Sequence, residues 1–159
     1  MLQCPIAGDA TDYITLHSDS FSLCVRGRRF CESFELSLVC GAGYKMFGRV
    51  YMNGDATGKS THLSVFFVLA RGTFDVLQRW PFNQRVTMSL LDQVNARQHV
   101  SEAFRPDHSS AAFRRPTGDT NVATGFPKFV PLTALEKAQN VYVRDDTMFI
   151  RITVDCRDL

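Results

Sequence analysis

The sequence contains no apolar run of about 18 residues, so no transmembrane helix is expected. Its net charge is small, because 18 Lys and Arg stand against 16 Asp and Glu. A formal charge of +2 does not favour nucleic acid or an anionic membrane surface as a partner. Residues 1–18 lack the basic and apolar regions of a secretory signal peptide, so a cytoplasmic location is expected.

Motifs that bind a metal or activate a nucleophile are also lacking. The five cysteines include no CxxC pair, and the four histidines show no HxxxH or HExxH spacing. These residues are Cys4, Cys24, Cys31, Cys40 and Cys156, and His17, His62, His99 and His108. The chain has no G-x-S-x-G nucleophile elbow. The sequence therefore predicts a protein that is not an enzyme and that has no metal and no cofactor.

What the chain does contain is a set of β-strand patterns. Its 159 residues are enough for one domain, with 45% hydrophobic residues and thirteen Phe to fill the core. Apolar and polar residues alternate in 43–52, and β-branched and aromatic residues are frequent in 62–70, 85–92 and 147–154. Shorter candidates are 34–39 and either 13–16 or 21–25. Many short strands with little helix predict an antiparallel β-sandwich.

Helix and loop signals are few. Thr133 and Glu136 fit a capping box that opens about two helical turns, with Thr133 as the N-cap. Residues 73–78 could form one further turn before Trp80 and Pro81 end it. The segment 105–131 is long for a connection and is rich in Pro, Ser and Gly. We interpret it as a loop system at a binding face that contains one short strand.

One segment resembles a phosphate-binding P-loop. Residues 53–60 read NGDATGKS, with Asn53 where a P-loop has its first Gly. A P-loop must open a helix whose N-terminus faces the phosphates. The residues that follow, 62–69, have the pattern of a strand. The preferred interpretation is therefore a hairpin loop with Lys59 in solvent.

Four sequence blocks carry a family resemblance. They are GYKM…RVYMNGD…GKSTHLSVFFV, RWPFNQRVTMSLLDQ, EAFRPD…FRRPTGDTNVATG and YVRDDTMFIRITVD. In order and spacing they are similar to the C-terminal, MATH-type domain of the tumour necrosis factor receptor-associated factors, over residues 43–159. The resemblance implies an all-β, eight-stranded antiparallel sandwich with one or two short helices. Residues 1–42 are a divergent N-terminal segment that either supplies the first strands or is disordered.

The resemblance also implies a peptide-binding site. In the family an extended receptor tail adds to an exposed strand, a mode known as β-augmentation. The acid-binding pair matches Arg49 and Tyr51, whose guanidinium and hydroxyl can hold a ligand carboxylate. The remaining positions are neighbouring contacts, an apolar pocket and a backbone-pairing edge. They match Asp55 and Ala56 for the contacts, Phe66, Phe104 and Phe113 for the pocket, and Thr124 and Gly125 for the edge.

The sequence departs from the family at a glutamine-binding position. Three family serines match Ser110, Ala111 and Ala112 here, so two of the three hydroxyls are missing. A hydrogen bond contributes about 1 kcal/mol and an unsatisfied partner costs about 1–3 kcal/mol. Losing two hydroxyls would thus weaken a glutamine ligand by about ten- to a hundredfold. Phe126 replaces a smaller residue and would add apolar bulk beside the peptide.

These residues lead to two hypotheses about function. The first is a cytoplasmic adaptor domain that binds the tails of receptors of the TNF receptor type, or other adaptors, and forms a weak homotrimer or a heterotrimer with related factors. The second is a scaffold, assembly or competitor protein that keeps the sandwich but has reduced or lost tail binding. Neither hypothesis involves nucleic acid or membrane insertion.

Overall fold

The computed structural model describes residues 14–17, 20–26, 34–39, 43–137 and 139–155. Short helical turns are η1 (Ala56–Gly58), η2 (Asp75–Leu77), η3 (Ala111–Phe113) and α1 (Leu132–Leu135). The described strands are β1 Ile14–His17, β2 Ser20–Arg26, β3 Phe34–Val39, β4 Lys45–Tyr51, β5 His62–Ala70, β6 Val86–Leu90, β7 Val100–Phe104, β8 Thr124–Pro131 and β9 Thr147–Val154.

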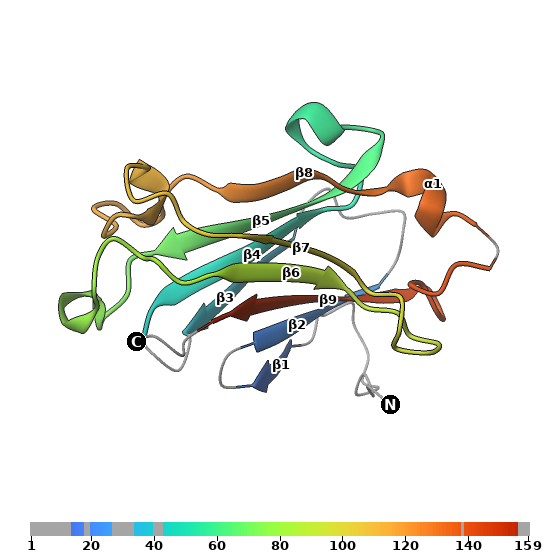
Figure 1. Cartoon of the computed structure of the whole chain (residues 1–159), viewed down its shortest axis with the longest axis horizontal. Coiled ribbons are helices and arrows are strands. Elements are labelled where there is room, and N and C mark those ends of the chain that lie inside the picture. Colours follow the sequence, from blue (N-terminus) through green and yellow to red (C-terminus); the bar gives the residue numbers. More distant parts are fainter. Residues whose placement is uncertain (1–13, 18–19, 27–33, 40–42, 138, 156–159) are drawn as a thin grey trace.

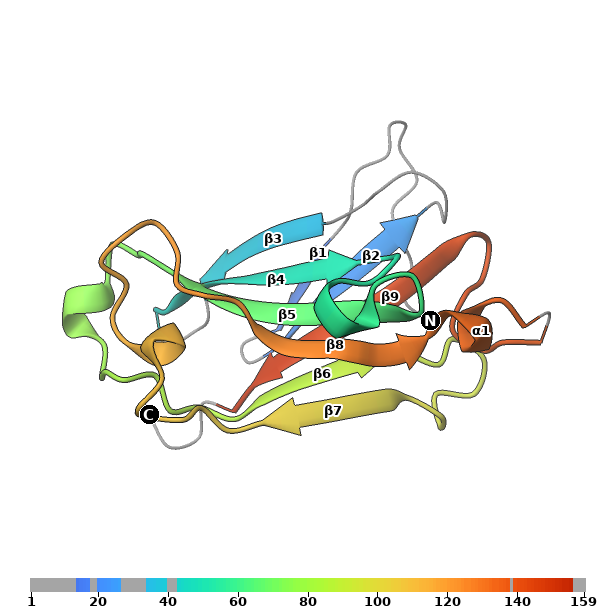
Figure 2. The same ribbon diagram turned by 90° about the horizontal axis from the view of Figure 1, so that it is seen from above.

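The strands form two sheets that lie one above the other (Figure 1). One sheet has the order β3-β4-β5-β8 and the other has the order β1-β2-β9-β6-β7. Every paired neighbour is antiparallel. Seen from above, β8 lies at the edge of the four-stranded sheet, beside β5 (Figure 2). No helix among the described residues is both long enough and apolar enough to cross a membrane.

Alternation along β4 assigns its side chains to two faces. Met46 and Val50 are buried against the opposite sheet, whereas Phe47, Arg49 and Tyr51 are half-buried on the outer face. The register continues this division, because residues directly opposite each other in an antiparallel pair share a face. Arg49 pairs with Phe66 of β5 and therefore brings Phe66 to the same outer face.

Aromatic rings fill the space between the sheets. Phe67 is 1% exposed and Phe82 is fully buried, and their rings stack with centroids 5.5 Å apart. Tyr44 meets Trp80 and Phe82 edge-on, each at 5.2 Å. The Tyr44 hydroxyl donates to the Arg79 carbonyl oxygen at 2.5 Å, so its polar end is satisfied inside the core.

The all-β sandwich is confirmed, but the expected count of eight strands is not. The described residues form nine strands. From sequence alone 13–16 and 21–25 are alternatives, whereas both contribute a strand, β1 and β2. β2 pairs with β9 and β3 pairs with β4, so strands from the divergent N-terminal segment join both sheets. A domain boundary at residue 43 stays a prediction.

Smaller features differ in part from the sequence expectations. The turn expected at 73–78 is confirmed as η2, whereas Thr133 is not the N-cap of α1. Pro131 holds that place, and no side chain caps the helix. Pro131 has φ −59° and ψ 133°, so the chain is still extended at this residue. The loop system at 105–131 contains η3 and ends in an eight-residue strand, β8.

A buried carboxylate organises the connection between β6 and β7. Asp92 is 4% exposed, and its two oxygens accept backbone N–H groups from four residues. These donors are Val94, Asn95, Arg97 and Gln98, at 2.8–3.2 Å. Burial alone would raise the pKa of Asp92, but the four hydrogen bonds outweigh it and lower the pKa to about 2.

We expect the ionised Asp92 carboxylate to stabilise the fold at neutral pH and to lose this effect in acid. A carboxyl whose pKa is lower in the folded state stabilises the fold above its unfolded pKa, near 3.9. That stability is lost as the pH falls from about 4 to about 2. Asp92→Asn should therefore lower the urea midpoint at pH 7, with a difference from the native protein that shrinks below pH 4. The exposed Asp119→Asn is the control, and an equal effect from it would contradict this assignment.

Candidate functional site

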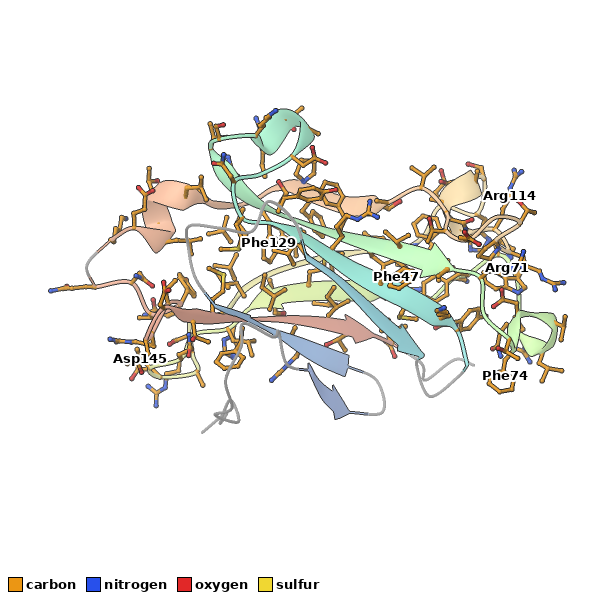
Figure 3. The ribbon with its side chains drawn as sticks, turned by 180° about the vertical axis from the view of Figure 1, so that it is seen from behind. Phe47, Arg71, Phe74, Arg114, Phe129 and Asp145 are labelled. Atoms are coloured by element: carbon orange, nitrogen blue, oxygen red, sulfur yellow. The ribbon has the colours of Figure 1, made fainter. Side chains whose placement is uncertain are left out.

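Four side chains form a strip on the outer face of the four-stranded sheet. We call Phe47, Arg49, Tyr51 and Phe66 the outer strip. All four are half-buried. Figure 3 shows Phe47 along the body of the sandwich, while Arg71, Phe74 and Arg114 lie at one end and Asp145 at the other. From Phe47 the strip runs along β4 toward η1, away from the end that carries Arg71.

The predicted acid-binding pair does lie on one face, two positions apart in β4. The Tyr51 ring packs edge-on against Phe66, with centroids 5.8 Å apart and planes at 89°. This contact holds the Tyr51 ring next to Phe66, the residue that pairs with Arg49. Arg49 makes an interaction of its own within the protein, and Glu35 is its partner in register on β3. A ligand carboxylate at Arg49 would thus join an arginine that is already positioned.

The outer strip leads directly to the open edge of the sheet. Arg49 pairs with Phe66, and Phe66 pairs in turn with Gly125 of β8, so the three form one row across three strands. A Cβ atom at Gly125 would lie 2.3 Å from the carbonyl oxygen of Val65. Only glycine permits this close approach of β8 to β5. Thr124 pairs with Phe67, which places both predicted edge residues in the ladder.

The three phenylalanines predicted to line one pocket are divided between two faces. Phe104 is half-buried on β7, and its ring lies 5.9 Å from Phe113 and 6.3 Å from Phe67. Phe113 is 3% exposed and belongs to the core. Among the described ring contacts, none joins either of them to Phe66. Because Phe113 is buried, its first role is in packing rather than at an open surface.

Phe126 lies on the inner side of β8, opposite Val65. Its ring centroid is 6.1 Å from that of Phe104 and 6.3 Å from that of Phe129. The Phe126 side chain, which was expected to add bulk beside the peptide, therefore packs mainly against aromatic rings between the two sheets. Among the described strands, β8 has no hydrogen-bonded neighbour on the side away from β5.

The replaced serine triplet is the start of η3. The Ser110 hydroxyl oxygen accepts the backbone N–H of Ala112 at 3.2 Å and caps the turn. Ala111 is exposed, whereas Ala112 is 7% exposed within the core cluster. Asn121 holds this turn in place by donating to the carbonyl oxygens of Ala112 and Arg114 at 3.0 and 2.7 Å. One hydroxyl is present where the family resemblance implies three.

The loop that resembled a P-loop is a hairpin loop, as the sequence predicted. The backbone N–H groups of Gly58 and Ser60 donate to the carbonyl oxygens of Asp55 and Asn53 at 2.9 and 2.7 Å. β5 follows the loop directly. Because its amides are used within the loop and no helix follows, the segment lacks the anion cradle of a P-loop. Ala56 is exposed, with φ at 48°.

Ser64 is a structural residue that sequence reasoning missed. It is fully buried on the outer side of β5, where its hydroxyl accepts the Asp55 backbone N–H at 2.9 Å. The same hydroxyl donates to the Pro127 carbonyl oxygen at 2.5 Å. Ser64 therefore ties the hairpin loop to β8, next to the outer strip. A serine within an apolar strand was the only signal in the sequence.

The part of the chain that the structure describes contains no group of three or more His, Cys, Asp or Glu placed to hold a metal ion. The features that remain are an arginine and a tyrosine on an outer sheet face, and a strand edge one residue pair away. The Arg49 guanidinium and the Tyr51 hydroxyl can each donate a hydrogen bond to an anionic group at this face.

Comparison with known proteins identifies the family. A model of the TRAF/meprin MATH domain matches residues 16–151. The chain is 56% identical over 117 residues to human TNF receptor-associated factor 2 and 50% identical over 117 residues to mouse TNF receptor-associated factor 5. These matches cover 74% of this chain but only 23% and 21% of the relatives' own lengths.

A solved structure agrees with the sequence matches. TRAF5 of Notothenia coriiceps superposes with a TM-score of 0.72 and 48% sequence identity, over 79% of this chain and 64% of that chain. The family model spans residues that form most of both sheets. The chain therefore belongs to the TRAF/meprin MATH domain family, as a domain of the TRAF-C type.

Proposed function

We propose that this domain is a cytoplasmic signalling adaptor that binds extended acidic peptides in receptor tails of the TNF receptor type. It has no catalytic activity of its own. The observation that carries the proposal is the row Arg49, Phe66 and Gly125, which joins a cationic side chain to the open edge of β8. Two relatives bear names that associate them with TNF receptors, which supports the choice of partner.

In the row Arg49, Phe66 and Gly125, both the backbone and the side chains would contribute to peptide binding. A peptide that lies beside β8 gains main-chain hydrogen bonds, which depend little on its sequence. The Arg49 guanidinium adds a charge-assisted hydrogen bond to a peptide carboxylate, and the Tyr51 hydroxyl donates a second. Phe66 lies between these groups and β8, so it offers apolar area to a small or apolar ligand side chain. Specificity then depends on one acidic and one apolar position.

Glutamine selection should be weaker than the family pattern implies. Ser110 is the one hydroxyl of the triplet, and it already caps η3. Ala111 and Ala112 carry no hydroxyl, so neither side chain can replace the lost hydrogen bonds. A ligand with a small or apolar residue in place of glutamine should bind this domain about as well as the glutamine peptide.

The alternative is a scaffold or competitor protein that retains the sandwich without tail binding. The loss of two hydroxyls at Ala111 and Ala112 is the observation that favours it. A weak homotrimer, or a heterotrimer with related factors, is compatible with both proposals. The two differ in whether Arg49 is needed to capture a partner.

Peptide binding by purified protein separates these proposals. We expect saturable binding of fluorescent acidic tail peptides and a loss of about ten- to a hundredfold in affinity for Arg49→Ala/Tyr51→Phe, because a charged hydrogen bond contributes about 1.5–3 kcal/mol. Fluorescence polarisation gives the dissociation constants. The control is Arg85→Ala, which removes an exposed cation next to β6.

Two results would contradict the adaptor proposal. One is the absence of binding by a protein shown to be folded, even to peptides displayed at high density, and this would favour the scaffold. The other is an equal loss of affinity for the double variant and for Arg85→Ala. That outcome would mean that net charge, and not the outer strip, attracts the peptide.

A further inference from the structure

Two lysines lie beside the open edge of β8, and the acid-binding pair does not account for them. Lys59 is the C-cap of η1 in the hairpin loop, and Lys128 lies within β8. Both side chains are exposed. Within the described part of the chain, no carboxylate is in ion-pair distance of either ammonium group.

Each of these two lysines is next in sequence to a residue of a direct backbone contact between η1 and β8. η1 presses on β8 so closely that a Cβ atom at Gly58 would lie 1.7 Å from the carbonyl oxygen of Pro127. Lys59 follows Gly58 and Lys128 follows Pro127, so each lysine is the chain neighbour of a contact residue. In Figure 2, η1 lies over the part of the sheet where β5 and β8 run side by side.

The backbone that carries Lys128 is fixed in position. The β5–β8 register shifts between Leu63 and Val65, which places Pro127 and its neighbours opposite Ser64. The Ser64 hydroxyl holds the Pro127 carbonyl oxygen, and the Phe129 ring is buried in the core. Lys128, between these two anchored residues, is exposed and cannot turn inward without breaking one of them.

We infer that Lys59 and Lys128 select a second acidic residue in the same peptide, and this inference rests on the proposed function. Lys59 and Lys128 place two positive charges at the corner of the sandwich where η1 meets β8. They raise the local positive potential, and a peptide carboxylate bound there would lower it. The row through Tyr51 and Ser64 lies between the Arg49 row and this corner. Since strands rise about 3.3 Å per residue, the second acid should be about two to four residues from the first.

Matched peptides test the inference. The parent peptide carries one acidic residue, and each companion carries an additional Glu two, three or four positions away, on one side or the other. We expect one companion to bind the native domain about three- to fivefold more tightly than the parent, because exposed ion pairs contribute about 0.2–1 kcal/mol each. Lys59→Ala/Lys128→Ala should remove this gain and leave the affinity for the parent peptide unchanged.

The control removes two exposed cations elsewhere, as Arg97→Ala/Arg144→Ala, and should keep the gain. Parent binding with no gain from any added Glu would overturn the lysine inference alone. A gain that survives in the lysine variant, or that falls equally in both double variants, would also overturn it. No binding of any peptide would overturn the proposed function, and the inference with it.

Discussion

Phe67→Ala should lower the free energy of unfolding by about 3–5 kcal/mol, the usual cost of removing a buried phenylalanine ring. Phe67 is 1% exposed and touches rings from two other strands or turns. It stacks on Phe82 and meets Phe104 at 6.3 Å. Phe82 is fully buried and Phe104 belongs to β7 of the opposite sheet, so the cavity cannot collapse easily. Urea unfolding followed by tryptophan fluorescence, which reports on Trp80, would measure the change.

The adjacent residue provides a matched control. Phe66→Ala removes the same number of atoms from the same strand, but on the half-exposed outer face. We expect it to cost less stability than Phe67→Ala and to weaken peptide binding instead. Equal losses of stability for the two variants would contradict the division of β5 into an inner and an outer face.

Gly58→Ala is the second large effect that we expect. The added methyl group would lie 1.7 Å from the carbonyl oxygen of Pro127, a backbone atom that cannot turn away. The hairpin loop must lift off β8, which would break the Ser64 bridge to Asp55 and Pro127. Overpacking costs about 1–3 kcal/mol and the stranded buried hydroxyl adds about 1–3 kcal/mol. A fall of several degrees in the melting temperature should result.

Gly118→Ala is the control for backbone freedom, because a Cβ atom at Gly118 would meet nothing within 4 Å. Its melting temperature should equal that of the native protein. Since η1 lies on β8, Gly58→Ala should also weaken peptide binding more than its loss of stability explains. An unchanged melting temperature for Gly58→Ala would show that the loop does not rest on β8 in solution.

Alternation made β4 predictable from sequence, because one of its faces is buried and the other is half-buried. β5 and β9 were predictable from their many β-branched and aromatic residues, since most of their side chains are buried. β7 was missed because its sequence, VSEAF, belongs to an edge strand whose Ser101 and Glu102 are exposed. Such a strand is defined by its pairing with β6, a long-range contact that no local pattern records.

The site shows the same limit. Arg49 and Tyr51 could be placed on one face from their spacing alone, and the structure agrees. Spacing could not show that Phe66 and Phe113 point to different environments, because one follows strand alternation and the other sits in a turn. Ser64 was unpredictable for a different reason. Its partners, Asp55 and Pro127, come together only after β8 has paired with β5.

The composition of β8 limits how far a sheet can grow from its edge. Pro127 and Pro131 have no backbone N–H to donate to a further strand, and Lys128 is exposed between them. A second copy of the domain that paired edge to edge would meet these gaps and would bring two Lys128 ammonium groups together. Under the proposed function, a short peptide would need only the segment around Gly125. The same edge would then bind one peptide and still oppose the growth of a continuous β-sheet.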